Sequence, residues 1–355
     1  MKYMMKKKYG MILKGLIIFH VSCFMFNLLS SCGLRQAQAT QDGTTAQDSS
    51  STESEHVEGS SQEVPVFDAD SAFVFCQAQC DFGPRTMNSE AHDQCARWIA
   101  TKFSGYGMMI TEQYATLKGY DGTPLKSMNI IASYKPELKD RILICAHWDS
   151  RPWADNDPDE VNHKKPVLAA NDGASGVAVM LELARHISGV GVGVDFVCFD
   201  AEDWGVPQWS DAPDRGDSWA LGAQYWSSRI TPQQAQTYRY GILLDMVGGQ
   251  GARFYQEQMS IYYARSVVDK VWNAAQAVGY GSLFPKQPGG NITDDHIPVN
   301  RVARIPCIDI IPYYPDCEQS SFGPTWHTVH DDMDHIDRTT LRAVGQTLLQ
   351  VLYSE

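Results

Sequence analysis

Seven side chains with metal-ligand chemistry stand at the ends of short apolar runs or in the loops after them: His147, Asp149, Asp172, Glu202, Asp203, Asp245 and His327. Catalytic zinc sites take three protein groups through imidazole nitrogen and carboxylate oxygen, and they keep one position open. Two histidines and three aspartates among these residues supply one such set, or two sets that share a carboxylate. Glu202 precedes a candidate ligand, and this favours a role in proton transfer.

The segments before these residues predict the elements that position them. Arg141–His147 and Val194–Asp200 are short, continuously apolar runs, typical of buried parallel strands. Ala169–Gly176 and an apolar helical pattern over Val177–Ile187 lie between them, so the order is strand, loop, helix, strand. Ligands of such units sit beyond the carboxyl ends of the strands. The candidate residues are therefore expected at one edge of a sheet.

The remaining pattern predicts one α/β domain over 64–355, with a central mixed, mostly parallel twisted β-sheet flanked by helices on both faces. Further strands are predicted at Ser127–Tyr134, with Ile142–Ala146 as its neighbour, at Tyr240–Met246 and at Arg304–Pro312. Helices are predicted within Asp70–Tyr106, broken at Phe82–Arg85, and at Ser218–Ser228, Ser260–Ala277 and His335–Tyr353. Asp331, Asp332 and Asp334 are expected to cap the last of these helices.

The first residues resemble an export signal. Lysines precede an apolar run, Gly15–Leu29, that is short for a membrane span. The run closes on Leu29-Ser30-Ser31-Cys32, which resembles the bacterial lipoprotein box. We expect a signal peptide over 1–31, a lipidated Cys32 and a polar, disordered tether over 32–63. The product would be exported and lipid-anchored to the cell envelope, facing the periplasm; an ordinary secretory signal is the alternative.

Charge and cysteine usage narrow the function classes. The formal net charge of −13 excludes nucleic acid as a partner and favours a cationic substrate such as a free amino terminus. Seven of the nine cysteines follow Cys32, and no CxxC pair is present, so a zinc-thiolate site is not expected. Cys145, Cys198 and Cys307 fall in predicted strands and are expected to be small buried hydrophobic residues.

Six motifs together resemble the zinc-dependent glutaminyl-peptide cyclotransferases, a branch of the zinc aminopeptidase-like superfamily: Ala146-His-Trp-Asp-Ser150, Asn171-Asp-Gly, Asp200-Ala-Glu-Asp203, Leu244-Asp-Met, Asp294-Asp-His-Ile-Pro298 and Thr325-Trp-His-Thr328. The similarity covers roughly Phe82 to the last residue. The strand-end motifs alone fit the aminopeptidases. Trp326 before His327, and the run from Asp294 to Pro298, are similar to the cyclase pattern.

The resemblance implies one zinc ion per chain, held by Asp172, Asp203 and His327. Asp203 departs from the animal enzymes, which carry Glu there, and fits the bacterial branch. Glu202 matches the proton shuttle, and Asp245 and Asp294 match the carboxylates in its hydrogen-bonded network; Asp295 is a less favoured candidate than Asp294.

Trp209 and Trp326 match aromatic residues of the substrate pocket. His296 fits either the pocket or a hydrogen-bonded place in the core, and we assign it to the pocket. His147 and Asp149 are expected to support the site through hydrogen bonds.

The implied substrates are peptides or proteins with an N-terminal glutamine, which is converted to pyroglutamate with release of ammonia. Two other hypotheses stay open. One is a two-zinc aminopeptidase in which Glu202 activates a bridging water, since all five ligands for it are present. The other is a lipid-anchored binding protein without catalysis, against which the retained Glu202 argues.

Overall fold

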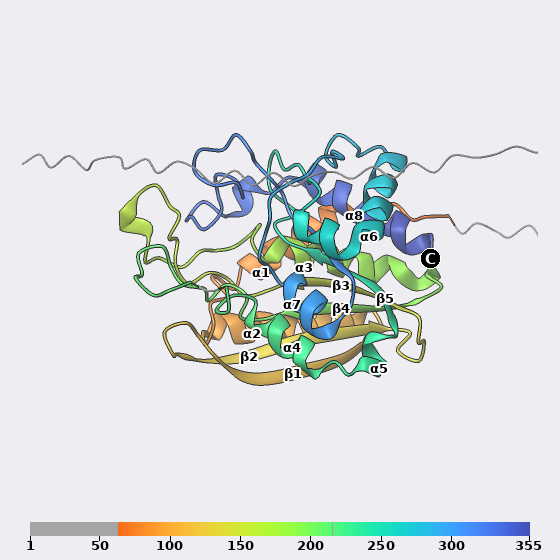
Figure 1. The fold of residues 1–355 in the computed structure, drawn as a ribbon, viewed down its shortest axis with the longest axis horizontal. Coiled ribbons are helices and arrows are strands. Elements are labelled where there is room, and N and C mark those ends of the chain that lie inside the picture. The colour runs from red at the N-terminus through yellow and green to blue at the C-terminus, as the bar shows by residue number, and fades with distance from the viewer. Residues whose placement is uncertain (1–62, 215) are drawn as a thin grey trace, which may run out of the picture. The chain divides into compact units, whose positions relative to one another are not determined.

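The computed structural model describes residues 63–214 and 216–355 (Figure 1). The predicted signal peptide, Cys32 and nearly all of the predicted tether lie outside these residues. Within them, no helix combines the length and the apolar character needed to cross a membrane. The strands are β1 Met109–Lys118, β2 Pro124–Tyr134, β3 Arg141–His147, β4 Gly193–Phe199, β5 Tyr238–Leu244 and β6 Cys307–Ile310.

The helices agree with the predicted pattern, and the break at Phe82–Arg85 separates the first two. They are α1 Ala69–Cys80, α2 Glu90–Gly105, α3 Ala174–His186, α4 Leu221–Arg229, α5 Pro232–Ala235, α6 Gln258–Ala277, the single turn α7 His296–Pro298 and α8 Arg338–Tyr353. Shorter helical turns are η1 Glu160–Asn162, η2 Ile187–Gly189, η3 Val299–Ala303 and η4 Met333–His335.

The strands form one six-stranded sheet in the order β1-β2-β4-β3-β5-β6. The four strands β4, β3, β5 and β6 pair in parallel, and β1 and β2 add antiparallel pairs at one side. The predicted mixed, mostly parallel α/β fold is therefore confirmed. In such a sheet the four parallel strands deliver their carboxyl ends to a common edge.

One predicted neighbour relation is wrong, because β4 lies between β2 and β3. Residues 135–140 link β2 to β3 and pass over the start of β4, a distance of about two strand spacings or ~10 Å. Arg141 fixes this link, since its guanidinium donates to the carbonyls of Lys135 and Leu138 and pairs with buried Asp195. The short link over 135–140 therefore connects β2 to β3 although β4 lies between them.

Helices cover both faces of the sheet (Figure 1). Alternate strand residues such as Ile142 and Ile144 join the larger core, which holds α1, α2, α3, α6 and α8. Leu143 and Cys145 face the smaller core, which holds α4 and η3. Cys145, Cys198 and Cys307 are buried free thiols, as predicted. Each strand of the centre is buried along its whole length, which explains its continuous apolar sequence.

Gly173 is the residue that lets the chain turn into α3. Its φ of 110° is a conformation that L side chains rarely adopt, and an added Cβ would lie 2.8 Å from the Asp149 carbonyl oxygen. We expect Gly173→Ala to lower the free energy of unfolding by about 1–3 kcal/mol in a denaturant titration. Gly279→Ala is the matched control, because Gly279 also has positive φ but nothing within 4 Å of an added Cβ. Equal losses in both variants would show that the close contact at Gly173 costs nothing.

Candidate metal centre and its pocket

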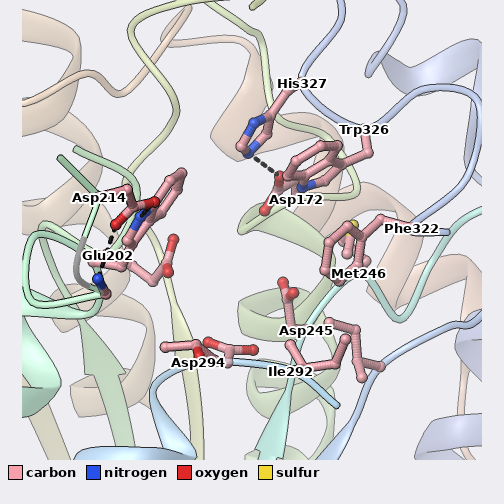
Figure 2. A pocket seen from close by; sticks show the side chains of 14 residues that line it. Asp172, Glu202, Asp214, Asp245, Met246, Ile292, Asp294, Phe322, Trp326 and His327 are labelled. Carbon is pink, nitrogen blue, oxygen red and sulfur yellow. Dashed lines mark hydrogen bonds and ion pairs between the residues drawn. The ribbon is translucent and has the colours of Figure 1, made fainter. Parts of the chain in front are cut away.

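Asp172, Asp203 and His327 converge at the carboxyl edge of the sheet. Figure 2 shows two of them, Asp172 and His327. Asp172 precedes α3, Asp203 follows β4, and His327 lies on the loop before η4. His327 Nε2 lies 3.5 Å from an Asp172 oxygen and 3.3 Å from an Asp203 oxygen. Ligand atoms bound tetrahedrally to one zinc ion at about 2.0–2.2 Å stand roughly 3.3–3.5 Å apart. The spacing therefore fits zinc.

The chemistry of the three groups fits a cation as well. All three side chains are buried, and Asp203 Oδ2 has no hydrogen-bond partner among the described residues. On the far side of the imidazole, His327 Nδ1 lies 3.4 Å from an Asp155 oxygen. A carboxylate behind a histidine fixes the tautomer that directs its other nitrogen to a metal. Arg151 holds Asp155 in turn and lies 3.3 Å from Asp203. The sequence analysis missed Arg151 and Asp155.

Two further buried aspartates fix the backbone of the site. Asp149 accepts hydrogen bonds from the backbone amides of Glu202 and Asp203 at 3.0 and 3.2 Å. It therefore fixes the backbone of both residues and does not occupy their carboxylates. Asp331 accepts from the amides of Asn171 and Asp172 at 2.7 and 3.0 Å. The expectation that Asp331, Asp332 and Asp334 cap the last helix is wrong, because Asp337 caps α8, while Asp332 caps η4 and Asp334 lies within it.

We expect Asp331→Asn to weaken zinc binding. The amide keeps one acceptor but turns an NH₂ group toward a backbone N–H, so one of the two hydrogen bonds is lost. Loss of such an outer partner typically costs ~10–100-fold in metal affinity. Competition with a fluorescent zinc chelator measures the effect. Asp332→Asn is the control, since Asp332 only caps η4, and an unchanged zinc affinity in Asp331→Asn would refute this role.

His147 lies beside the triad and forms a second one. Its Nε2 is 3.0 Å from Asp172 and 3.3 Å from Asp245, and its Nδ1 lies 3.6 Å from Asp149. The ligand atoms of His147, Asp172 and Asp245 thus lie close enough together for a second cation. The same spacing also suits an imidazole N–H shared between two carboxylates. The geometry of His147 is compatible with one metal or with two.

Three acidic side chains outside the triad face the same pocket: Glu202, Asp245 and Asp294 (Figure 2). Burial, together with the charge of Asp203, raises the pKa of Glu202 well above its usual value. Burial raises the pKa of Asp245 to about 6, and burial with the neighbouring charge of Asp245 raises the pKa of Asp294 to about 7. Such carboxyl groups hold protons near neutral pH and can donate or accept them.

The predicted hydrogen-bonded network among these acids is not formed. Within the described residues no hydrogen bond joins Asp245 to Asp294, and one oxygen of each lacks a partner. Asp245 lies nearest His147, whereas Asp294 accepts the amide of Asp295. The two carboxylates are therefore coupled through their charges.

The pocket has a volume of about 520 Å³ and an aromatic wall made by Trp219, Phe322 and Trp326. Trp326 stacks on His327, with ring centroids 3.8 Å apart, and Phe322 packs against it at 4.8 Å. Trp219 lies nearly parallel to the His327 ring at 6.1 Å. The structure thus places Trp326 in the pocket wall, as the resemblance implies, and adds Trp219.

Trp209 and His296 do not line this pocket. A turn at Pro207–Ser210 directs Trp209 outward, where it is 41% exposed and packs on Trp153 and His163. His296 is fully buried behind Asp294, at 3.4 Å from Glu257 and 3.9 Å from Asp309. Asp294 reaches the pocket, whereas His296 is enclosed by protein, although ligand atoms of the two side chains lie within 4.8 Å of one another. The assignment of both residues to the pocket is corrected accordingly.

Three of the eight described non-glycine residues with positive φ adjoin or belong to the candidate site. They are Ala201, Met246 and His327, with φ values of 55°, 49° and 53°. Non-glycine residues in this region cost about 1–3 kcal/mol and gather where function requires a particular geometry.

Comparisons with known proteins show what this chain resembles in family and in fold. Residues 129–352 match Peptidase family M28. The aminopeptidase YwaD of Bacillus subtilis is 28% identical over 257 residues, which cover 70% of this chain and 49% of that protein. The chain thus spans about half the length of this curated relative.

Two solved structures superpose over their full length. The Bacteroides thetaiotaomicron glutaminyl cyclase bound to N-acetylhistamine is 52% identical, with a TM-score of 0.80 over 82% of this chain and 100% of that chain. The Tannerella forsythia glutaminyl cyclase is 48% identical, with a TM-score of 0.79 over the same shares. The family match covers well over half of the sequence, and the chain therefore belongs to Peptidase family M28.

Proposed function

We propose that this protein is a zinc-dependent glutaminyl-peptide cyclotransferase. The observation that carries the proposal is the similarity to two solved glutaminyl cyclases. Their sequences are 52% and 48% identical to this chain, and the similarity covers the whole of each of them. The pocket agrees with it, because Glu202 faces the cavity beside the candidate metal triad while an aromatic wall encloses the remaining space. The pocket volume is sufficient for an N-terminal glutamine residue.

The proposed chemistry assigns a role to each group. A zinc ion held by Asp172, Asp203 and His327 would act as a Lewis acid that polarises the side-chain amide of the substrate glutamine. Glu202 accepts a proton from the α-amine as its nitrogen attacks the amide carbon and closes the five-membered lactam. Glu202 then returns the proton to the departing nitrogen, which leaves as ammonia. The products are a pyroglutamyl peptide and ammonia, and no water is consumed.

The surrounding residues serve the same reaction. Amine and amide belong to one molecule, so holding them in attack geometry supplies much of the acceleration. The aromatic wall of Trp219, Phe322 and Trp326 keeps water away from the reacting groups and orients the glutamine chain. The raised pKa values of Asp245 and Asp294 favour their neutral forms, and this limits the negative charge around Glu202.

A peptide assay tests the proposal. The full chain, loaded with zinc, is incubated with a glutamine-initiated peptide, and the products are read by mass spectrometry and an ammonia assay. We expect ammonia and an otherwise intact peptide with a blocked amino terminus. The same peptide with an acetylated amine is the control and should not react. Release of a free amino acid would refute cyclisation and establish the aminopeptidase instead.

The second triad, His147 with Asp172 and Asp245, favours a two-zinc aminopeptidase as the competing function. We propose one zinc ion per chain, with His147 donating its Nε2 proton between the two carboxylates. What supports this is the 3.0 Å separation of His147 Nε2 and an Asp172 oxygen, the usual length of an N–H···O hydrogen bond. Two tightly held zinc ions per chain would contradict the proposal.

We also propose that the protein is exported and anchored to the bacterial cell envelope through a lipidated Cys32, facing the periplasm. The support is the apolar run Gly15–Leu29 and the lipoprotein-like Leu29–Cys32 sequence. Cells grown with a clickable palmitate analogue should label the native chain and not Cys32→Ser, which should leave the membrane fraction. Cys317→Ser is the matched control. Labelling that persists in Cys32→Ser would refute the anchor.

A further inference from the structure

We infer that Asp214 selects the residue that follows the N-terminal glutamine, favouring cationic over acidic side chains. The inference rests on the proposed function. It concerns the rim of the pocket, which lies outside the reacting groups.

The charged side chains among the described residues that line the pocket are all acidic. Five carboxylates line it, and none of its described lining residues is Lys or Arg. Four of the five, Asp172, Glu202, Asp245 and Asp294, are buried at the floor, where a bound metal ion would offset part of their charge. Asp214 differs from them because it is exposed to solvent. Its charge is therefore available to a substrate group outside the reacting centre.

Asp214 is held in place at this rim. One carboxylate oxygen accepts the amide of Gly216 at 2.8 Å, and the other accepts the indole N–H of Trp219 at 3.1 Å (Figure 2). Trp219 is itself fixed, because its ring lies nearly parallel to that of His327 and the Arg151 guanidinium lies 4.7 Å from the ring centroid. A Cβ on Gly216 would approach Thr293 to 3.7 Å, so this segment lies close to the other wall of the pocket. The carboxylate is a fixed charge rather than a mobile one.

A bound peptide must pass this position. The glutamine amide and amine are both required at the floor, so the peptide carbonyl leads outward to the exposed lining residues Asp214, Gly216 and Thr293. Asp214 is the charged member of these three. A lysine or arginine in the second position can bring its charge to within a few ångströms of the carboxylate, whereas a glutamate is repelled. Discrimination then comes from attraction and repulsion together.

The test compares kcat/KM for three peptides that differ only in the second residue: Gln-Lys, Gln-Ala and Gln-Glu with a common remainder. The native enzyme should rank them in that order. Exposed ion pairs and repulsions are each weak, so in Asp214→Asn we expect the Lys-to-Glu ratio to fall by about threefold to tenfold. Asparagine retains one oxygen acceptor, for the Trp219 indole or for the Gly216 amide, so this variant removes the charge and one of the two hydrogen bonds with little change in side-chain size. High salt should reduce the native ratio in the same direction.

Two further variants separate the effect of the Asp214 charge from the effect of its packing against Trp219. Asp217→Asn removes an exposed charge three residues away that does not line the pocket, and the ratio should stay at the native value. Asp214→Ala also removes the contact with Trp219. If Asp214→Ala alters the ratio and Asp214→Asn does not, packing rather than charge is responsible and the inference is wrong. Absence of ammonia release from all three peptides would instead refute the proposed function itself.

Discussion

Glu202→Gln is expected to reduce kcat for ammonia release by about 10²–10⁴-fold, the usual contribution of a positioned proton-transfer group. Glutamine has nearly the same shape but cannot accept the amine proton. Because Glu202 is held through its backbone amide by Asp149, the substitution should leave the neighbouring Asp203 in place. Zinc content and KM should therefore change little while kcat falls. Rates on a glutamine-initiated peptide and metal analysis of the same preparation measure both.

Glu318→Gln provides the control, because Glu318 is an exposed residue outside the pocket. Unchanged turnover in Glu202→Gln would refute the proposed mechanism. Turnover that is lost while zinc is retained would exclude the hypothesis of a binding protein without catalysis. A variant that loses both zinc and activity would show instead that Glu202 helps to hold the metal, against the division of roles proposed for Glu202 and Asp203.

The sequence predicts the centre of this fold well because the physical signal there is strong. β3 and β4 are buried on both faces, so their sequences are continuously apolar, and both end where polar residues begin. The edge strand β1 was missed because its residues are exposed or only partly buried. The order of β2, β4 and β3 also escaped prediction, since it depends on buried Arg141, which lets residues 135–140 pass over one strand.

In the candidate site, too, the residues next to buried regular elements could be predicted from the sequence, and those placed by distant contacts could not. Asp172, Asp203 and Asp245 lie next to regular elements whose position is set by the core, and the structure brings them to one edge. The loop over 204–219 has no periodic pattern, so its sequence does not say whether Trp209 or Trp219 turns inward. The contact of Trp219 with His327 decides this, and those residues are far apart in sequence. Asp155 and Asp331 were missed for the same reason, because each acts on a residue of a distant segment.

His327→Gln and His147→Gln should separate the two histidines of the site by their effect on zinc content. His327 faces both Asp172 and Asp203, and its loss removes one of three proposed ligands. We expect zinc content to fall from one ion per chain to nearly none. Activity should fall by more than the ~10–100-fold that loss of an outer hydrogen-bond partner costs. Thermal stability at saturating zinc should fall as well, because binding to the native state alone contributes RT ln(1 + [L]/Kd).

His147→Gln is the matched variant, since His147 is equally buried and also lies against Asp172. If His147 donates a hydrogen bond, as proposed, one zinc ion per chain remains and its affinity falls moderately. If His147 is instead a ligand, the native chain holds two zinc ions and the variant holds one. That result would overturn the single-metal proposal and, because two metals can share a bridging water, would shift the balance toward hydrolysis of N-terminal residues. Metal analysis of the native chain and both variants, after identical dialysis, therefore tests the metal count and the competing function together.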